Sequence, residues 1–377
     1  MQRIYLDNNA TTALDPRVFK AMLADLSGPP ANPSSIHWEG QMARNLLSKA
    51  RATLASFFLA KPEEIIFTSG GTEGINFFIR GLKSKGHVLT TAIEHSAIYR
   101  TLQTLEAQGL DVTYLPIGLW GAPTPEEIAH AIKPTTQAIF LSPSNGETGV
   151  KIDLNGISEV AEKKGIPLFL DAVSYVGKEP LVLPLGVAGV AISGHKFHAP
   201  KGIGAVYLRS PMKIAPLITG GNQEYQKRSG TENLSGILGL AEAIQILQEK
   251  HTEITQYLRD LRLHLEAGLF RMIPDLAING EGPKISNVSN VAFLGVDGET
   301  LLMHLDMVGI SVSHGSACSS GSLEPSRVLT QMGVDRKTAK SSLRISLSRM
   351  NTREEIDLCI EKMAHIVSKL RKLGAPR

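Results

Sequence analysis

Short apolar runs alternate with amphipathic stretches over the first two thirds of the chain. Seven of these runs predict strands, and most of them are separated by a segment with helical periodicity: residues 63–69, 86–94, 111–117, 136–142, 166–171, 187–193 and 202–208. This alternation is typical of a mainly parallel sheet with helices on both faces. The last two runs are joined by GHKFHAPK, which leaves no room for a helix, so one strand there can be antiparallel. The pattern predicts an α/β fold around a seven-stranded, mainly parallel sheet.

The pattern changes near Gly239. Apolar residues then recur at alternating spacings of four and three, with one histidine in the series: Leu240, Ile244, Leu247, His251, Ile254, Leu258, Leu261 and Leu265. A coiled coil is one interpretation, but the histidine in its seam and the unsorted charges favour a long helix that bridges two domains.

The last third predicts a smaller α/β domain. Residues 287–296 and 307–315 have the pattern of strands, and the final helix opens with a capping box of Thr352 and Glu355. We therefore expect a large domain over residues 15–250 and a small domain formed by residues 1–14 and 251–377.

Composition restricts the partners of this protein. The 377 residues are 42% hydrophobic and 20% charged, with a formal net charge of +3, as in ordinary soluble domains. The basic residues are dispersed, which argues against nucleic acid and anionic membrane surfaces as partners. The longest apolar stretch, residues 180–193, contains Pro184 and two glycines and is not a membrane span.

Two further features indicate the compartment. The N-terminus lacks the apolar core of a signal peptide. The two cysteines, Cys318 and Cys359, are too few for a disulfide framework or a cysteine-rich metal site. The histidines have no metal-ligand spacing, so we expect no metal site. A reducing, cytoplasmic location fits these observations best.

One lysine and one aspartate suit the chemistry of pyridoxal phosphate. Lys196 follows a histidine in the Gly-flanked loop SGHKFHAPKGIG, and Asp171 closes a predicted strand. A lysine amine can form a Schiff base with the cofactor aldehyde, and a carboxylate can keep the pyridine nitrogen protonated. Taken singly, each residue is more typical of a solvated loop or a turn. Ligands of open α/β sheets, however, bind at the carboxyl ends of strands, where both residues fall.

The segment FTSGGTEG offers an anion site between a predicted strand and a predicted helix. Its glycines let backbone amides approach an anion, and a helix N-terminus favours negative charge. The segment lacks the ending of a nucleotide P-loop and the spacing of a dinucleotide fingerprint. A Gly-rich turn alone is a weak signal, but Ser193 and His195 beside Lys196 could hold the same phosphate.

His95 and Cys318 are candidates for proton transfer and nucleophilic attack. A single histidine is more often structural, but an imidazole beside a pyridoxal ring can stack on it and move protons. Cys318 lies among small residues between Gly315 and Gly321, as expected for an exposed thiol on a loop, although an inert loop cysteine is an equally good interpretation. Cys359 lies in an apolar helical pattern and is expected to be packing.

Nine motifs between residues 5 and 326 carry a family resemblance. In order, they are YLDNNATT, NPSSIH, FTSGGTEG, EHSA, ETGV, DAVS, SGHKFHAPKGIG, RSGTEN and GSACSSGSLEPS. Together they resemble the cysteine desulfurases of the nitrogen-fixation and iron–sulfur-cluster branch, within the class V aminotransferase superfamily. The resemblance implies a homodimeric pyridoxal phosphate enzyme of fold type I, with its active site at the dimer interface.

The resemblance also implies an activity. A cysteine desulfurase converts L-cysteine to L-alanine and holds the sulfur as a persulfide, here on Cys318. An acceptor protein of iron–sulfur cluster assembly or thiolation then takes the sulfur.

The resemblance further assigns roles to individual residues. Lys196 is the Schiff-base lysine, Asp171 the partner of the pyridine nitrogen, and His95 the residue that stacks on the ring and shares proton transfer with Lys196. The phosphate ligands are Gly71, Thr72, Ser193 and His195, joined by Thr231 from the other subunit. Arg344 matches the arginine that binds the substrate carboxylate, a task suited to its planar fork.

The chain departs from the family pattern at two cofactor contacts. The family usually has asparagine directly before the glutamate of ETG, where this chain has Gly146 preceded by Asn145. It usually has glutamine three residues after the aspartate, where this chain has Ser174. Both usual side chains contact the 3′ oxygen of the cofactor, and the asparagine also holds substrate. We therefore assign Ser174 to the cofactor and Asn145 to both cofactor and substrate.

Alternatives to a cysteine desulfurase remain open. One is a class V aminotransferase or a selenocysteine lyase. Another is a weakly active partner protein in a sulfur-transfer complex. The Cys318 loop and EHSA argue against transamination, which needs neither, and Lys196 argues against a pure scaffold.

Overall fold

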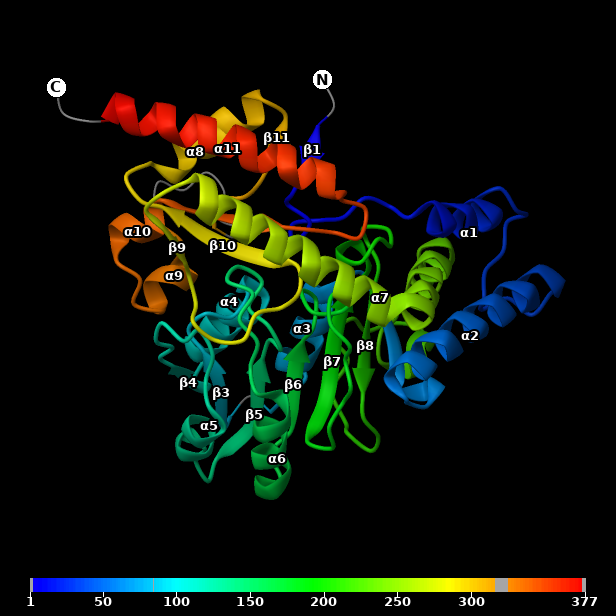
Figure 1. The fold of residues 1–377 in the computed structure, drawn as a ribbon. Helices are drawn as coiled ribbons and strands as arrows, with labels where there is room; N and C mark the ends of the chain where they lie inside the picture. Colours follow the sequence, from blue (N-terminus) through cyan, green and yellow to red (C-terminus); the bar gives the residue numbers. More distant parts are fainter. Residues whose placement is uncertain (1–2, 84, 316–324, 375–377) are drawn as a thin grey trace.

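The larger unit of the protein is built on one seven-stranded sheet. The computed structural model describes residues 3–83, 85–315 and 325–374 (Figure 1). The strand order is β2-β8-β7-β6-β5-β3-β4. The strands are β2 (Ile65–Thr68), β3 (His87–Thr91), β4 (Asp111–Leu115), β5 (Thr136–Leu141), β6 (Leu168–Asp171), β7 (Val187–Ser193) and β8 (Gly204–Leu208). β8 is antiparallel to both of its neighbours, and the other pairs of this sheet are parallel. All seven predicted strands are confirmed, and so is an antiparallel strand beside the GHKFHAPK loop.

Helices cover both faces of this sheet (Figure 1). They are α1 (Pro16–Leu26), α2 (Trp38–Phe58), α3 (Gly71–Arg80), α4 (Ser96–Glu106), α5 (Pro125–Ala131) and α6 (Leu154–Lys164), with short 3₁₀ turns η1 (Pro62–Glu64), η2 (Gly194–Lys196) and η3 (Gln223–Gln226). The buried side chains form separate clusters on the two faces. Phe78 and Phe140 belong to one, and Leu170 and Leu240 belong to the other. Strands such as β6 are therefore buried at every position, as expected for a sheet that is covered on both sides.

One long helix connects the two units of the molecule. α7 (Leu234–Met272) has 39 residues and is therefore about 58 Å long. It packs against α1 and α2 near its start and against the last helix, α11 (Arg353–Gly374), further along. The apolar positions of its predicted repeat are buried, and His251 is half-buried. The predicted bridging helix is confirmed. The predicted domain boundary at residue 250 lies inside this helix, and the division itself stays a prediction.

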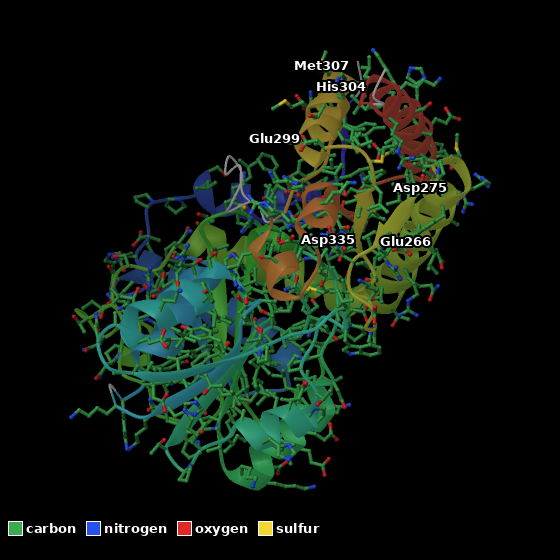
Figure 2. The ribbon with its side chains drawn as sticks, turned by 90° about the vertical axis from the view of Figure 1, so that its left-hand side faces the viewer. Glu266, Asp275, Glu299, His304, Met307 and Asp335 are labelled. Atoms are coloured by element: carbon green, nitrogen blue, oxygen red, sulfur yellow. The ribbon has the colours of Figure 1, made fainter. Side chains whose placement is uncertain are left out.

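The smaller unit combines two short sheets with the C-terminal helices. Its elements are β1 (Ile4–Tyr5), β9 (Leu276–Ile278), β10 (Val288–Phe293), β11 (Ile310–Ser311), β12 (Ser342–Ser346), α8 (Gly298–Met307), α9 (Arg327–Gln331), α10 (Arg336–Lys340) and α11. β10 lies between β9 and β12 in an antiparallel sheet, while β1 pairs with β11 in parallel. Figure 2 shows Glu299, His304 and Met307 of α8 at the outer end of this unit. The predicted strands at 287–296 and 307–315 are confirmed, whereas β9 and β12 were not predicted.

The capping box of the last helix is confirmed. The backbone N–H of Glu355 donates to the Thr352 hydroxyl (3.3 Å), and the backbone N–H of Thr352 donates to the Glu355 carboxylate (3.2 Å). Cys359 on this helix is fully buried, and burial raises the pKa of its thiol to about 12. Its predicted packing role is therefore confirmed. Among the described helices, none has the length and apolar character of a membrane span.

A buried ion pair holds a left-handed turn close to the large sheet. The guanidinium of Arg51 donates two hydrogen bonds to Glu224 (2.6 and 2.8 Å), whose carboxylate also accepts from the backbone N–H of Phe67 (2.8 Å). Glu224, Tyr225 and Gln226 have φ values of 47°, 56° and 64°. Each left-handed residue other than glycine costs roughly 1–2 kcal/mol. The ion pair therefore anchors a strained turn just before RSGTEN.

Gln226→Gly is expected to stabilise the protein by about 1 kcal/mol, because glycine adopts a positive φ without strain. Urea unfolding of full-length protein measures this change. Lys227→Gly is the matched control, since Lys227 has a φ of −97°, and this variant should be destabilised. Equal destabilisation of both variants would show that the turn is not strained at Gln226.

Candidate active site

A cavity of about 290 Å³ lies at the carboxyl ends of the parallel strands. Asp171 ends β6, Ser193 ends β7, and the segment after β3 leads to His95. Ten of the residues predicted from the sequence line this cavity: Gly71, Thr72, His95, Asn145, Asp171, Ser174, Ser193, His195, Lys196 and Arg344. The structure thus brings together residues that are up to 273 positions apart, from Gly71 to Arg344.

The two residues with the strongest cofactor chemistry come from neighbouring strands. Lys196 lies in η2, directly after β7, and its Nζ donates to the backbone carbonyls of Asn9 and Ala10. Asp171 is buried, and its Oδ1 accepts from the backbone N–H of Val173 (3.1 Å). Burial raises the pKa of Asp171, while His95 and Lys196 oppose this effect. A positively charged partner at this carboxylate would favour its ionised form.

The N-terminus of α3 offers the features expected of a phosphate site. Gly71 and Thr72 begin this helix, where backbone N–H groups have no helical partner. A Cβ added to Gly71 would lie 2.3 Å from Cγ2 of Val173, so this position requires glycine. Across the cavity, the Nδ1 of His195 contacts the hydroxyl of Thr11 (3.1 Å). Burial and nearby lysines lower the pKa of His195 to about 4, which keeps this imidazole neutral near pH 7.

His95 is oriented by the helix that it begins. It is the N-cap residue of α4, and its Nδ1 accepts a hydrogen bond from the backbone N–H of Ala97 (3.1 Å). In the neutral ring, the proton therefore resides on Nε2. A neutral His95 thus has an N–H donor at Nε2, while Nδ1 accepts the hydrogen bond from the first turn of α4.

Gly146 and Ser174, the two departures from the family pattern, lie next to one another in the structure. The amide of Asn145 donates to the carbonyl of Ile93 (3.1 Å) and accepts from the backbone N–H groups of Glu147 and Thr148 (2.9 and 3.0 Å). It therefore stabilises the turn that contains ETG. A Cβ added to Gly146 would lie 2.8 Å from the hydroxyl oxygen of Ser174. A side chain at position 146 could fit only if Ser174 moved, so the two positions depend on one another.

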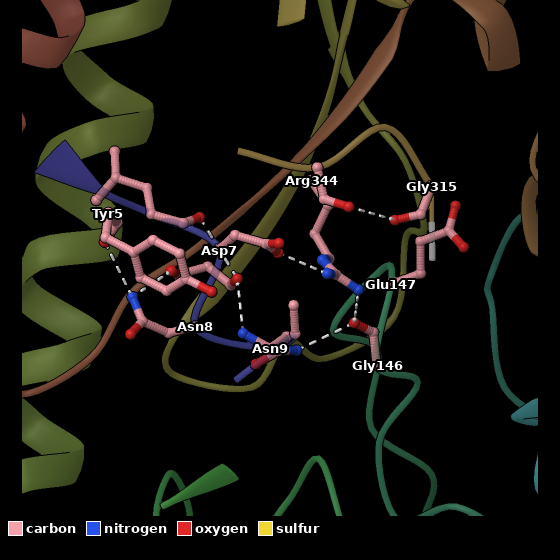
Figure 3. A network of polar contacts seen from close by, with 12 residues as sticks. Tyr5, Asp7, Asn8, Asn9, Gly146, Glu147, Gly315 and Arg344 are labelled. Carbon is pink, nitrogen blue, oxygen red and sulfur yellow. Dashed lines mark hydrogen bonds and ion pairs between the residues drawn. The ribbon is translucent and has the colours of Figure 1, made fainter. Parts of the chain in front are cut away.

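Arg344 lies on β12 at the boundary with the smaller unit (Figure 3). Its guanidinium donates to the Asp7 carboxylate (2.7 Å) and to the Gly146 carbonyl (3.3 Å), while its Nε has no partner among the described residues. Glu147 is buried nearby, and in the described part of the chain neither of its carboxylate oxygens has a hydrogen-bond partner within bonding distance. Burial raises the pKa of Glu147, whereas Ser326, Arg344 and Arg327 oppose this effect. Unpaired polar atoms at a cavity wall fit a site that binds a polar ligand.

Several residues that line the cavity were not identified from the sequence, among them Asn9, Arg327 and Glu94. Asn9 donates to the Gly146 carbonyl (3.0 Å) and accepts from Asn287 (3.0 Å). Arg327 donates to the backbone carbonyls of Ala92 and Glu94, and its guanidinium lies 4.1 Å from the ring centre of Tyr99. Asn9 lies in the quoted motif YLDNNATT, which was one available signal. Nothing in the local pattern marks Arg327.

Glu94 is the third of these residues. Its carboxylate accepts from the Thr91 hydroxyl (2.9 Å) and from the Ser142 backbone and hydroxyl (3.0 and 2.6 Å). Burial raises its pKa from 4.5 to about 7, and the charge of Asp171 adds to the effect. Its position directly before His95, in EHSA, was the available signal.

One predicted residue, Thr231, lies elsewhere. Thr231 lines a separate cavity of about 100 Å³ together with Ser69 and Arg228. One chain therefore does not bring Thr231 to the main cavity, and its contribution from a second subunit stays a prediction. Cys318 lies outside the described residues. Among the residues that are described, no three His, Cys, Asp or Glu side chains form a group that could hold a metal ion.

Comparison with known proteins identifies the protein family to which the chain belongs. Residues 4–359 match the family model described as aminotransferase class-V. The chain is thus a member of the class-V aminotransferase family, as its motifs predicted.

The individual relatives narrow this assignment. A protein named cysteine desulfurase IscS from Methanosarcina thermophila is 41% identical over 98% of this chain and 93% of that protein. A cysteine desulfurase from a Nostoc strain is 41% identical over 99% of this chain and 95% of its own length. Within the family, the chain belongs with the cysteine desulfurases.

Solved structures agree with this placement. A NifS-like protein superimposes with a TM-score of 0.91 at 35% identity, over 98% of this chain and 100% of that one. A NifS-like protein from Rickettsia africae gives a TM-score of 0.89 at 31% identity, over 97% and 100% of the two chains. The predicted fold class is confirmed.

Glu94→Gln tests the electrostatics of the cavity. A carboxyl whose pKa is raised on folding contributes stability below its unfolded pKa of 4.5 and loses it as the pH rises through about 7. Glutamine does not titrate and can keep the contacts to Thr91 and Ser142. The variant should therefore gain stability relative to the wild type between pH 4.5 and pH 8, by roughly 3 kcal/mol.

Urea unfolding at a series of pH values measures this difference. Glu162→Gln on the exposed surface of α6 controls for the loss of one negative charge. A stability difference between Glu94→Gln and the wild type that stays constant with pH would contradict the raised pKa of Glu94.

Proposed function

We propose that this protein is a pyridoxal phosphate-dependent cysteine desulfurase that converts L-cysteine to L-alanine and retains the sulfur as a persulfide on Cys318. The observation that carries the proposal is the juxtaposition of Lys196 and Asp171 at adjacent strand ends of one cavity. Relatives of nearly equal length are named cysteine desulfurases, which supports the choice of reaction.

The residues present fit the cofactor. Lys196 supplies the amine for covalent attachment, Asp171 faces the cavity as a buried carboxylate, and the start of α3 offers amides to a phosphate. When bound, pyridoxal phosphate supplies an aldehyde and a ring that withdraws electrons from the substrate Cα. In this proposal, Gly71, Thr72, Ser193 and His195 hold the phosphate, and Ser174 lies near the 3′ oxygen.

Substrate recognition is proposed for Arg344. Asp7 and the Gly146 carbonyl fix its guanidinium, while the Nε, which has no partner in residues 3–83, 85–315 and 325–374, leaves a donor for a carboxylate. An arginine fork binds carboxylates with defined geometry. Asn145 acts on the substrate through the turn that it stabilises around Gly146.

Proton and sulfur transfer are divided among three residues in this proposal. Lys196 takes the proton from the substrate Cα, and His95 carries protons at Nε2. The Cys318 thiolate then forms a bond to the substrate sulfur as the C–S bond breaks, and protonation of the remaining carbon yields alanine. The persulfide passes to an acceptor protein of iron–sulfur cluster assembly or thiolation.

The assembly proposed here is a cytoplasmic homodimer. Thr231 lies in a second cavity rather than in the main one, which fits a contribution of Thr231 of the partner subunit to the phosphate site. Apolar side chains on α1 and α2, such as Phe19 and Trp38, are more than half exposed in the single chain. A second copy could cover them.

The cofactor assignment is tested by locating the modified lysine. The purified protein should be yellow, and borohydride reduction followed by peptide mapping should label Lys196. Lys196→Ala should lose this label, because its side chain has no amine to form the covalent bond. Lys201→Ala, an exposed lysine in the same loop, is the matched control and should keep the label. Labelling of another lysine would overturn the cofactor assignment.

The persulfide assignment is tested with the two cysteines. Cys318→Ser should bind cofactor and cysteine, but its rate of sulfide release should fall by about 100-fold or more. A hydroxyl is a poor nucleophile at neutral pH. Cys359→Ser should keep its rate in folded protein, because Cys359 is buried in α11. Full activity of Cys318→Ser would rule out the persulfide on Cys318.

A further inference from the structure

Arg327 begins a short helix of the smaller unit and contacts the segment that leads to His95. This segment, residues 92–94, connects β3 to His95, the residue before α4. The guanidinium of Arg327 donates from one terminal nitrogen to the Ala92 carbonyl and from the other to the Glu94 carbonyl (2.5 Å). The planar fork of arginine suits such a double contact. Arg327 therefore ties the backbone before His95 to a helix of the other unit.

The carbonyl between these two contacts is also held by a side chain. The Ile93 carbonyl accepts from the amide of Asn145 (3.1 Å). Residues 92–94 lie between a strand and a helix, so their carbonyls need partners from outside those elements. Each of the three carbonyls before His95 thus accepts from a side chain distant in sequence, and Arg327 provides two of these three contacts.

Arg327 also contacts the chain that follows His95. Its guanidinium lies 4.1 Å from the ring centre of Tyr99, within the range of attraction between a cation and an aromatic face. Tyr99 lies in the first turn of α4, and its backbone N–H donates to the His95 carbonyl (3.0 Å). Arg327 therefore holds the backbone on both sides of His95.

Apolar contacts place α9 against the same segment. Val328 and Met332 are buried with Ile93 and Ile117 in a small cluster, separate from the two clusters on the faces of the large sheet. This packing is independent of the guanidinium. A substitution that removes only the donors of Arg327 therefore leaves the apolar contacts of α9 in place.

The orientation of His95 depends on the backbone that Arg327 holds. His95 is the N-cap of α4, a position that requires extended backbone before the helix. Only with this geometry does its Nδ1 accept from the backbone N–H of Ala97 (3.1 Å). That hydrogen bond places the proton of the neutral ring on Nε2. A looser segment before His95 would weaken the selection of this tautomer.

Arg327 lines the cavity, so direct binding of an anion is the alternative role. An arginine that binds a carboxylate uses two parallel N–H groups. In Arg327, both terminal nitrogens already donate to backbone carbonyls. The contacts therefore favour a role in positioning.

We propose that Arg327 is a positioning residue for His95: it holds the Ala92 and Glu94 carbonyls before the histidine and the Tyr99 ring after it, and thereby selects the Nε2–H tautomer. The consequence for catalysis rests on the proposed function, in which His95 carries protons at Nε2. The selection of the tautomer does not depend on the reaction.

Three variants isolate the contribution of the guanidinium. Arg327→Met keeps an unbranched stem and removes the charge and all donors. Arg327→Lys keeps the charge but lacks the planar fork that reaches two carbonyls. Arg100→Met is the matched control, because the exposed guanidinium of Arg100 lies 6.0 Å from the centre of the same Tyr99 ring but donates to the Gln103 side chain (3.1 Å).

The readout is the tautomer of His95 in full-length protein as purified. Long-range nitrogen–proton NMR spectra of isotope-labelled histidine report it at a pH where imidazole is neutral, and a His95→Gln spectrum assigns the signal. The wild type and Arg100→Met should show the proton on Nε2 alone. Arg327→Met should lose this single tautomer and show a mixture, and Arg327→Lys should show a smaller share of the second form.

Steady-state kinetics of alanine formation supply the second readout. Arg327→Met should lower kcat about tenfold and leave the KM for cysteine within about twofold, because a misplaced proton carrier slows chemistry without weakening binding. Arg100→Met should keep both values. A raised KM with unchanged kcat in Arg327→Met would show that Arg327 binds substrate and would overturn the positioning role.

The two proposals fail in different ways. A single Nε2–H tautomer in both Arg327 variants would overturn the role of Arg327, even if their urea midpoints of unfolding fall, since that result describes a purely structural residue. Arg327→Lys keeps the test available if Arg327→Met fails to fold. Absence of alanine formation by the wild type, together with a mixed tautomer in Arg327→Met, would overturn the proposed function and support the positioning of His95.

Discussion

The parallel pairing of β6 with β7 is the interaction on which the site depends. Its register places Asp171 opposite Ala191, so that the carboxylate and the loop carrying Lys196 emerge at the same edge of the sheet. Both strands are buried on their two faces, and a slip of one residue would exchange the side chains between two packed layers. The covered sheet therefore fixes the relative position of two groups that no local sequence pattern connects.

The N-terminal segment joins this edge to the smaller unit. Asp7 binds Arg344 (2.7 Å), Asn9 binds Gly146 (3.0 Å), and the carbonyls of Asn9 and Ala10 accept from Lys196. β1 pairs with β11 directly before these residues. A segment of a few residues thus positions the arginine, the altered turn and the lysine at once, which explains why the site needs both ends of the chain.

Much of the fold, and the gathering of ten predicted residues around one cavity, could be predicted because they follow from periodicity and strand-end position. The seven strands and α7 have strong patterns, and Asp171, Lys196 and the Gly71 turn stand at strand ends. β9 and β12 were missed because β9 has three residues and β12, SLRIS, is buried at every position, which leaves no alternation to detect. Arg327 acts through contacts with backbone carbonyls distant in sequence, which leave no local signal, whereas Asn9 and Glu94 lie within two of the motifs.

The most direct test of the account is to incubate the purified, cofactor-loaded protein with L-cysteine and a reductant and to quantify sulfide and alanine in the same sample. If Lys196, Asp171 and Arg344 act on cysteine as proposed, we expect equal amounts of sulfide and alanine. Sulfide without alanine, or neither product in protein whose Lys196 carries the cofactor, would contradict the assignment as a cysteine desulfurase.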